Sequence, residues 1–135
     1  MGMFSAMDIA VSGATVSRTW MDAIAHNVAN VNTVNEAGQE PFRAQIVAAE
    51  AVRFGNGDPG GVRVRSIEVR NAEPAVVHDP TDPQADENGM VTKPVVDLGQ
   101  EMTNLVIASR TYEANLGVMD RVRDSYMAAL RIGQR

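Results

Sequence analysis

Apolar residues recur at helical spacing at both ends of this 135-residue chain, and the stretch between the ends alternates apolar and polar residues. The first apolar stripe comprises Phe4, Met7, Val11, Ala14, Met21, Ala25 and Val28. The second comprises Leu98, Met102, Leu105, Tyr112, Leu116, Met119, Tyr126 and Leu130. Steps of three and four residues are those of a heptad repeat, so the pattern predicts two long helices paired as in a coiled coil.

Each predicted helix also carries a second apolar edge beside its stripe. The N-terminal edge comprises Ile9, Val16, Trp20 and Ile24, and the C-terminal edge comprises Val106, Val118, Val122 and Ile132. The stripes themselves are interrupted by Arg18, Ser109 and Arg123. Because one partner helix cannot cover both edges, we expect each helix to contact further neighbours.

The chain therefore divides into residues 1–33, a β-rich middle of 34–94, and residues 95–135, which is an α+β organisation. The first helix is expected to run from about Phe4 to about Asn30. In the middle, we predict strands over 42–54, 62–69, 75–78 and 90–93, and the last two form a hairpin. A slip in the alternation at Arg65 and Ser66 indicates a β-bulge. Asp97, with Gln100 three residues later, is typical of an N-cap and its capping-box partner.

Two glycines lie inside the predicted helices, Gly13 and Gly117. Glycine in a helix costs about 1 kcal/mol relative to alanine. That cost is most easily explained if another backbone passes close to each glycine.

Composition and charge exclude several functional classes. The formal net charge is -5, and residues 34–94 hold ten acidic against six basic residues, so a nucleic-acid surface is not expected. The absence of cysteine removes disulfides, thiol catalysis and cysteine-based zinc sites. No stretch approaches the roughly 20 apolar residues of a membrane-spanning helix. The first residues lack the features of a cleavable signal peptide.

Candidate catalytic, metal and cofactor sites all have simpler explanations. The segment Gly55-Asn56-Gly57-Asp58-Pro59-Gly60 matches a dinucleotide fingerprint, but strand residues follow it instead of a helix, so we expect a turn. Neither His26 nor His78 has a second histidine or a nucleophile at a useful spacing. The acidic loop 79–89 lacks the ligand order of a calcium site, and a solvated turn explains it. We therefore expect no catalytic residues, metal or cofactor.

Two short motifs at opposite ends of the chain carry a family resemblance. The segment 27–33, Asn-Val-Ala-Asn-Val-Asn-Thr, resembles the N-A-N-x-x-T ending of the first helix in bacterial flagellar axial proteins. Residues 108–115 are similar to the A-x-R-x-Y-x-A-N segment of the last helix of that family. The motif residues are Asn27, Ala29, Asn30, Thr33, Arg110, Tyr112, Ala114 and Asn115. The 41–44 and 80–94 segments resemble those of proximal rod members, although Met90 and Val95 replace a usual Tyr and Asn.

The resemblance implies a structural subunit of the proximal rod of the flagellar basal body, with no catalysis. It implies that 1–33 and 95–135 form the rod core and that 34–94 lies outside it. The implied partners are other proximal and distal rod subunits, the adaptor between the MS ring and the rod, and the flagellar type III export apparatus. The implied location is the periplasmic rod, reached from the cytoplasm without a cleavable signal.

Under this interpretation, the stripes form the helix seam and subunit interface. The expected interface residues are Phe4, Met7, Val11, Met21, Val28, Leu98, Met102, Leu105, Tyr112, Leu116, Met119, Tyr126 and Leu130. Two other interpretations stay open. A soluble coiled-coil adaptor would explain the heptads but not the paired motifs, and a small hydrolase would need a pocket that the short middle is not expected to form.

Overall fold

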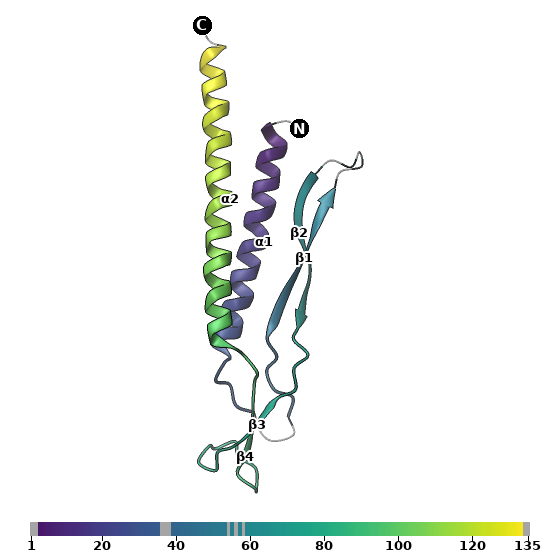
Figure 1. Ribbon diagram of the computed structural model, residues 1–135, viewed down its shortest axis with the longest axis vertical. Helices are drawn as coiled ribbons and strands as arrows, with labels where there is room; N and C mark the ends of the chain where they lie inside the picture. Colours follow the sequence, from purple (N-terminus) through teal and green to yellow (C-terminus); the bar gives the residue numbers. More distant parts are fainter. Residues whose placement is uncertain (1–2, 36–38, 54, 56, 58, 134–135) are drawn as a thin grey trace.

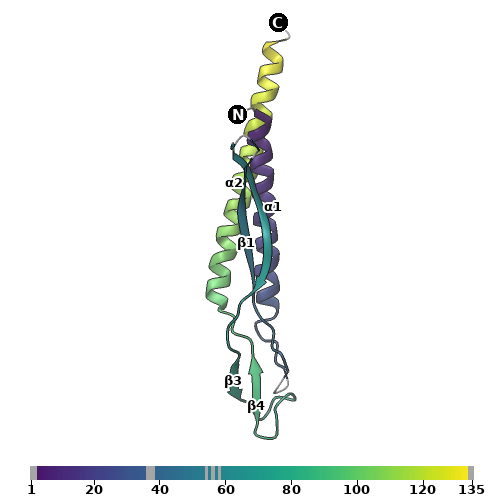
Figure 2. The same cartoon turned by 90° about the vertical axis from the view of Figure 1, so that its right-hand side faces the viewer.

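The molecule is elongated, with two antiparallel helices side by side and two small β-sheets (Figures 1 and 2). The computed structural model describes residues 3–35, 39–53, 55, 57 and 59–133. The elements are α1 (Met3–Ala29), β1 (Gln45–Arg53), β2 (Pro59–Val69), β3 (Ala75–His78), β4 (Met90–Lys93) and α2 (Leu98–Ile132). The predicted α+β organisation with paired terminal helices is confirmed. Phe54 and Arg135 lie outside the described residues.

Small side chains make up most of the fully buried positions on α1 and α2. Ala10 and Ala14 are buried on α1, and Ala108 is fully buried on α2. Ser17 is also buried, and its hydroxyl donates to the Gly13 carbonyl within α1. Small residues let two helix backbones approach closely, and larger stripe residues such as Leu105 and Tyr112 are half-buried beside them.

The β1–β2 hairpin lies along α1, which separates it from α2 (Figure 1). The two strands are antiparallel, and Ala48 pairs with Ser66 whereas Ala49 pairs with Val64, so Arg65 is the extra residue of a bulge. The predicted bulge is therefore confirmed. It keeps Val62, Val64, Ile67 and Val69 on one face of the hairpin, because an unbroken alternation would place the two pairs on opposite faces.

At the bulge, the side chains of Arg65 and Ser66 both hydrogen-bond to the Glu68 carboxylate. The Ser66 hydroxyl donates to the Glu68 carboxylate at 2.8 Å, and the Arg65 guanidinium donates to the same oxygen at 3.2 Å. These two hydrogen bonds lower the pKa of Glu68 below its ordinary value.

Two polar contacts fasten the hairpin to α1. Asn27, 1% exposed, accepts the Gln45 N–H at 2.7 Å and donates its amide to the Gln45 carbonyl at 2.9 Å. Further along α1, the Ser12 hydroxyl accepts the Val62 N–H at 3.0 Å and donates to the Ile9 carbonyl at 2.7 Å. Gly61 packs directly on Ser12 with φ +106°, a conformation and a proximity that leave no room for a side chain.

The β3–β4 hairpin lies at the end of the molecule where α1 ends and α2 begins (Figure 2). Its strands have the predicted bounds, and Val77 pairs with Val91. Asp86 organises the connecting loop, because its carboxylate accepts the N–H groups of Asn88 and Met90 at 2.8 Å each. The predicted turn function of the acidic loop is confirmed for Asp86.

The start of α2 is capped by Asp97, whose carboxylate accepts the Gln100 N–H at 3.0 Å. The predicted N-cap is confirmed. The reciprocal half of a capping box is not formed, since the Gln100 amide donates to Asn104 at 3.1 Å instead.

We predict that Asn27→Ala lowers the free energy of unfolding by about 1–3 kcal/mol, because it leaves the Gln45 N–H and carbonyl without partners in a buried site. Urea unfolding followed by circular dichroism measures this. Asn32→Ala, at an exposed position of the same motif segment, is the matched control and should change stability little. Equal midpoints for the two variants would contradict the assigned role of Asn27.

Candidate functional site

The predicted interface residues lie along the flanks of the α1–α2 contact. Met7, Met21, Val28, Leu105, Tyr112 and Met119 are half-buried, whereas Val11, Leu98, Met102, Leu116, Tyr126 and Leu130 are exposed. Phe4 belongs to α1, but its side chain lies outside the described part of the structure. None of these described side chains is fully buried, whereas Ala10, Ala14 and Ala108 are.

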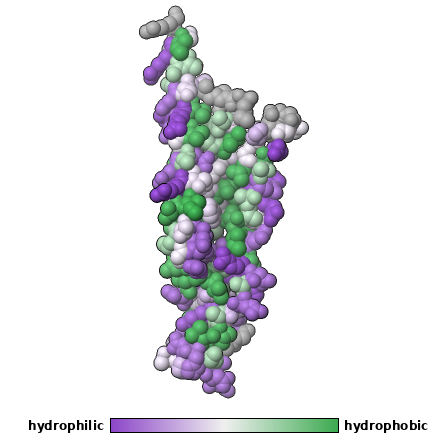
Figure 3. Space-filling model, in the orientation of Figure 1, coloured by the Kyte–Doolittle hydropathy of each residue, from purple (hydrophilic) through white to green (hydrophobic). Residues whose placement is uncertain are grey.

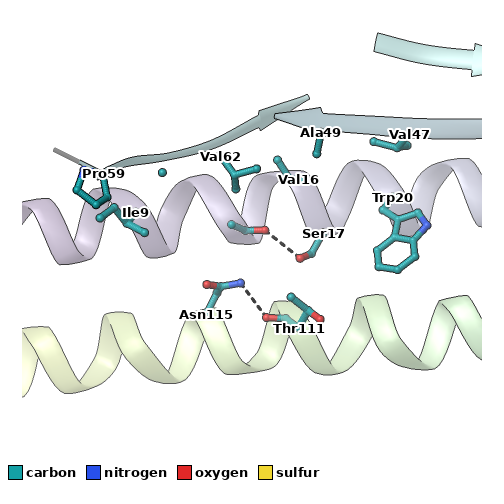
Figure 4. A pocket seen from close by; sticks show the side chains of 12 residues that line it. Ile9, Val16, Ser17, Trp20, Val47, Ala49, Pro59, Val62, Thr111 and Asn115 are labelled. Carbon is teal, nitrogen blue, oxygen red and sulfur yellow. Dashed lines mark hydrogen bonds between the residues drawn. The ribbon is translucent and has the colours of Figure 1, made fainter. Parts of the chain in front are cut away.

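The second apolar edges are divided between the interior and the surface. On α1, Ile24 is among the most buried residues, Val16 faces the β1–β2 hairpin, and the Trp20 ring lies on the side of α1 that faces α2 (Figure 4). On α2, Val106 is 53% exposed and Ile132 is 77% exposed. The second edge of α1 is thus covered within the chain, while that of α2 is largely not. Apolar side chains are visible at the surface along the helices and over the β3–β4 end (Figure 3).

Two grooves follow the helix pair on opposite flanks of α1. The smaller one, about 150 Å³, lies between Val11 and Arg18 of α1 and Tyr112 and Leu116 of α2. The larger one, about 640 Å³, is bounded by α1, the β1–β2 hairpin and α2 (Figure 4). Its lining residues are Ile9, Gly13, Val16, Ser17, Trp20, Val47, Ala49, Pro59, Gly61, Val62, Thr111 and Asn115. This lining contains no charged side chain, so the groove suits an apolar occupant and offers no acid, base or nucleophile pair.

The N-terminal motif residues shape the end of α1. The Asn30 amide donates to the His26 carbonyl at 2.8 Å, and the Thr33 hydroxyl donates to Asn30 Oδ1 at 3.2 Å. Ala29 is the exposed last residue of α1. Together with Asn27, these contacts end the helix and direct the chain toward β1. Their observed role is therefore structural.

The C-terminal motif residues are spread around α2. Arg110 and Ala114 are exposed, whereas Tyr112 and Asn115 are half-buried. Asn115 donates to the Thr111 carbonyl at 2.9 Å and faces Gly13 of α1. A Cβ on Gly13 would lie 2.8 Å from Asn115 Oδ1, so the glycine makes room for this amide.

The two helix glycines therefore differ. Gly13 is required by a close neighbour, although that neighbour is the Asn115 side chain and not a backbone as we expected. A Cβ on Gly117 would meet nothing within 4 Å, so no contact within the described chain explains this glycine. Gly117 is consequently free to admit a close approach from another molecule.

Sequence reasoning missed Ser12, Gly61, Ala10 and Ala108, although Ala14 belonged to the predicted stripe. A signal for the alanines was present, because Ala10 and Ala14 alternate with Gly13 and Ser17 on one side of α1. Small residues at that spacing indicate a close helix contact, but the weight given to large apolar residues concealed it.

The described residues show no arrangement suited to catalysis or metal binding. They contain no group of three or more histidine, aspartate or glutamate side chains that could hold a metal ion. His26 packs edge-on against Phe42, with ring centroids 5.3 Å apart, and His78 is exposed at the end of β3. The glycine-rich segment leads into β2 at Pro59 and not into a helix, so it lacks the geometry of a dinucleotide site.

Comparison with known proteins identifies the family to which the chain belongs. The flagellar basal-body rod protein FlgC of Salmonella typhimurium is 34% identical over 134 residues, covering 99% of this chain and 100% of that protein. The FlgC proteins of Bacillus subtilis and Aquifex aeolicus are 33% and 34% identical and cover 99% and 93% of this chain. The chain belongs to the FlgC family of flagellar basal-body rod proteins. Residues 87–132 also match the model described as "Flagellar basal body rod FlgEFG protein C-terminal".

Membership of the FlgC family establishes a structural rod protein and not an enzyme. The resemblance inferred from the two end motifs is therefore confirmed, and the soluble adaptor is not favoured. Within the described residues, no helix combines the length and apolar character needed to cross a membrane.

We predict different effects for alanine at the two helix glycines. Gly117→Ala should raise the free energy of unfolding of the free chain by about 0.5–1 kcal/mol, because it improves helix propensity in open space. Gly13→Ala should lose that gain, since Asn115 must move. Urea unfolding checks both variants.

A double-mutant cycle provides the control. Gly13→Ala should become stabilising in an Asn115→Ala background, with a coupling energy of about 1 kcal/mol. An identical effect of Gly13→Ala in both backgrounds would contradict the assigned contact.

Proposed function

We propose that this FlgC-family subunit polymerises into the proximal rod through the exposed faces of α1 and α2. In this proposal, residues 1–33 and 95–135 form the rod core, and 34–94 lies outside it and contacts adjacent rod proteins. The observation that carries the proposal is the exposure of large apolar side chains along α2, from Leu98 to Ile132.

The energetic argument starts from this exposed surface. Burial of apolar surface contributes roughly 25 cal/mol per Å². Contiguous apolar surface on a helix pair is unusual for a protein that acts alone, and it is the expected feature of an obligate assembly. The within-chain helix contact is narrow, so the stripes remain available for neighbouring subunits.

The distribution of the apolar faces favours an open, helical array. The groove on one flank of α1 is lined differently from the groove on the other flank. Contacts between two different patches are heterologous, and such contacts generate rings or helical filaments instead of closed two-fold dimers. A rod requires this kind of contact.

Family membership supports other flagellar rod components, proximal and distal, as the partners. We further propose contact with the adaptor between the MS ring and the rod, and passage through the flagellar type III export apparatus to the periplasmic part of the basal body. The narrow, two-helix shape of the chain is compatible with export as an unfolded polypeptide, because little tertiary structure has to be opened.

Leu116→Asp should block incorporation into the rod while the chain is still exported. Leu116 is 37% exposed, so the isolated chain tolerates the charge, whereas burial of an unpaired carboxylate in a subunit contact is costly. Peptide mass spectrometry of purified hook–basal bodies measures incorporation. The amount of the chain found in the periplasm and the culture medium measures export. We expect at least a roughly tenfold loss from the basal bodies, equivalent to about 1.4 kcal/mol.

Leu116→Met is the matched control, since it keeps an apolar side chain of similar volume and should assemble normally. Normal incorporation of Leu116→Asp would contradict the proposed interface. Absence of the unsubstituted chain from basal bodies would contradict the proposed function itself.

A further inference from the structure

The β3–β4 hairpin has one covered edge and one open edge. On the β4 side, Asn35 exchanges two backbone hydrogen bonds with Thr92, at 3.2 and 3.4 Å. Asp86 covers Met90 in the same way, because its N–H donates to the Met90 carbonyl at 3.0 Å and its carboxylate accepts the Met90 N–H at 2.8 Å. On the β3 side, no described strand pairs with the hairpin, and β4 is the only described helix or strand in contact with β3 (Figure 2).

The register shows which backbone groups point to the open edge. In an antiparallel pair, opposite residues alternate between hydrogen-bonded and non-hydrogen-bonded pairs. Thr92 and Met90 direct their N–H and carbonyl groups away from β3. Val76 and His78 lie opposite them, so they form non-hydrogen-bonded pairs and direct their own N–H and carbonyl groups to the open edge. No described residue binds these groups, which are therefore available to an added strand.

The side chains of β3 are also uncovered. Val76 is 62% exposed and Val77 is 40% exposed, on opposite faces of the hairpin. Proteins usually protect an edge strand with a lysine, a proline or an inward-facing charge, and the segment 75–78 contains none of these. Pro74 and Pro80 flank the strand and limit the open edge to a short segment, because proline cannot donate a ladder hydrogen bond.

A hollow on one face of the hairpin adjoins this edge. It measures about 480 Å³, and Pro74 and Val76 contribute apolar lining. Glu40 and Glu73 contribute carboxylates. Glu40 is paired with Arg43 at 3.2 Å, whereas Glu73 forms no ion pair with a described residue. Such a hollow suits a Lys or Arg side chain, whose methylene groups cover apolar walls while its charge reaches a carboxylate.

Charge favours a different protein over a second copy as the occupant of the edge. Residues 72–93 contain five acidic residues and one lysine. Pairing of two β3 strands from two copies would bring like charges together, which is unfavourable. The β2 strand of a second copy does not supply free basic groups, because its Arg63 and Arg65 are already paired with acidic side chains. A segment of another protein that carries Lys or Arg complements the hairpin.

We propose that the open edge of β3 binds an extended, Lys- or Arg-bearing segment of a different basal-body protein as an added strand. This inference rests on the proposed function, in which 34–94 contacts adjacent rod proteins, and it specifies the edge and the chemistry of that contact. The added strand hydrogen-bonds to the backbone of Val76 and His78, and one of its basic side chains lies in the hollow beside Glu73. In contacts of this kind, the main chain supplies affinity and alternate side chains supply specificity.

Hydrogen exchange at single amides tests the added strand. The amides of Val76 and His78 are followed by mass spectrometry with electron-transfer fragmentation, in the free chain and in purified basal bodies. We expect both amides to exchange at least roughly tenfold more slowly in basal bodies, because an inter-strand hydrogen bond protects an amide. The amide of Glu87 is the internal control, since it lies in the acidic loop beyond the β3 edge and should change little.

A proline at the edge blocks the added strand selectively. Val76→Pro removes an N–H that points to the open edge and not to β4, so it keeps the hydrogen bonds within the hairpin. In basal bodies that contain this variant, we expect the His78 amide to exchange as fast as in the free variant. Val76→Thr is the matched control, because it keeps the N–H and the β-branched shape and should preserve slow exchange. The comparison of the unsubstituted chain stands by itself if Val76→Pro disturbs the hairpin.

A charge reversal tests the chemistry of the occupant. Glu73→Lys should speed exchange of the Val76 amide in basal bodies by at least roughly threefold, because it repels a basic segment. Glu87→Lys makes the same change of charge in the loop and should have a smaller effect. Equal effects of the two substitutions would contradict a basic side chain beside Glu73.

Equal exchange of the Val76 and His78 amides in the free chain and in basal bodies would overturn the added strand while leaving the rod function intact. Slowing of these amides in concentrated solutions of the free chain alone would overturn it as well, because the occupant would then be a second copy. Chains missing from the basal bodies would instead contradict the proposed function.

Discussion

The α1–α2 contact depends on side chains that are small enough to let two helices lie close together. Ala10, Ala14 and Ala108 fill it, and Gly13 leaves the space that Asn115 occupies. Larger side chains such as Leu116 lie at the edge of this contact and remain partly exposed. A subunit with this arrangement keeps its bulky apolar groups available for its neighbours.

The β1–β2 hairpin is held in place by α1. The side-chain amide of Asn27 takes the place of a neighbouring strand, because it makes a hydrogen bond to both the N–H and the carbonyl of Gln45. Ser12 does the same for one N–H of β2, at the point where Gly61 allows close approach. α1 thus binds α2 through apolar contact on one side and the hairpin through polar contact on another, and the groove between the three elements follows from this geometry.

Much of this organisation could be predicted from the sequence. The period of the apolar residues predicted both helices, and the slip at Arg65 predicted the bulge, because both signals are local. The rest could not be predicted for a physical reason. Whether Leu116 or Ala108 occupies the seam depends on the distance and rotation of two helices far apart in the sequence, and both faces of α2 offer apolar residues. The end motifs identified the family, yet the structural role of Asn27 became visible only with β1 in place.

The central claim is that neighbouring subunits cover the exposed apolar faces of the helices. Hydroxyl-radical footprinting tests it directly, because the chain has eight methionines that report on exposure and three of them contrast usefully. Met102 and Met127 are exposed on α2, and Met90 is half-buried in β4, outside the helices. The account predicts that oxidation of Met102 and Met127 falls sharply in purified basal bodies relative to the free chain, and falls more than that of Met90. Equal oxidation of Met102 and Met127 in the free chain and in basal bodies would contradict it.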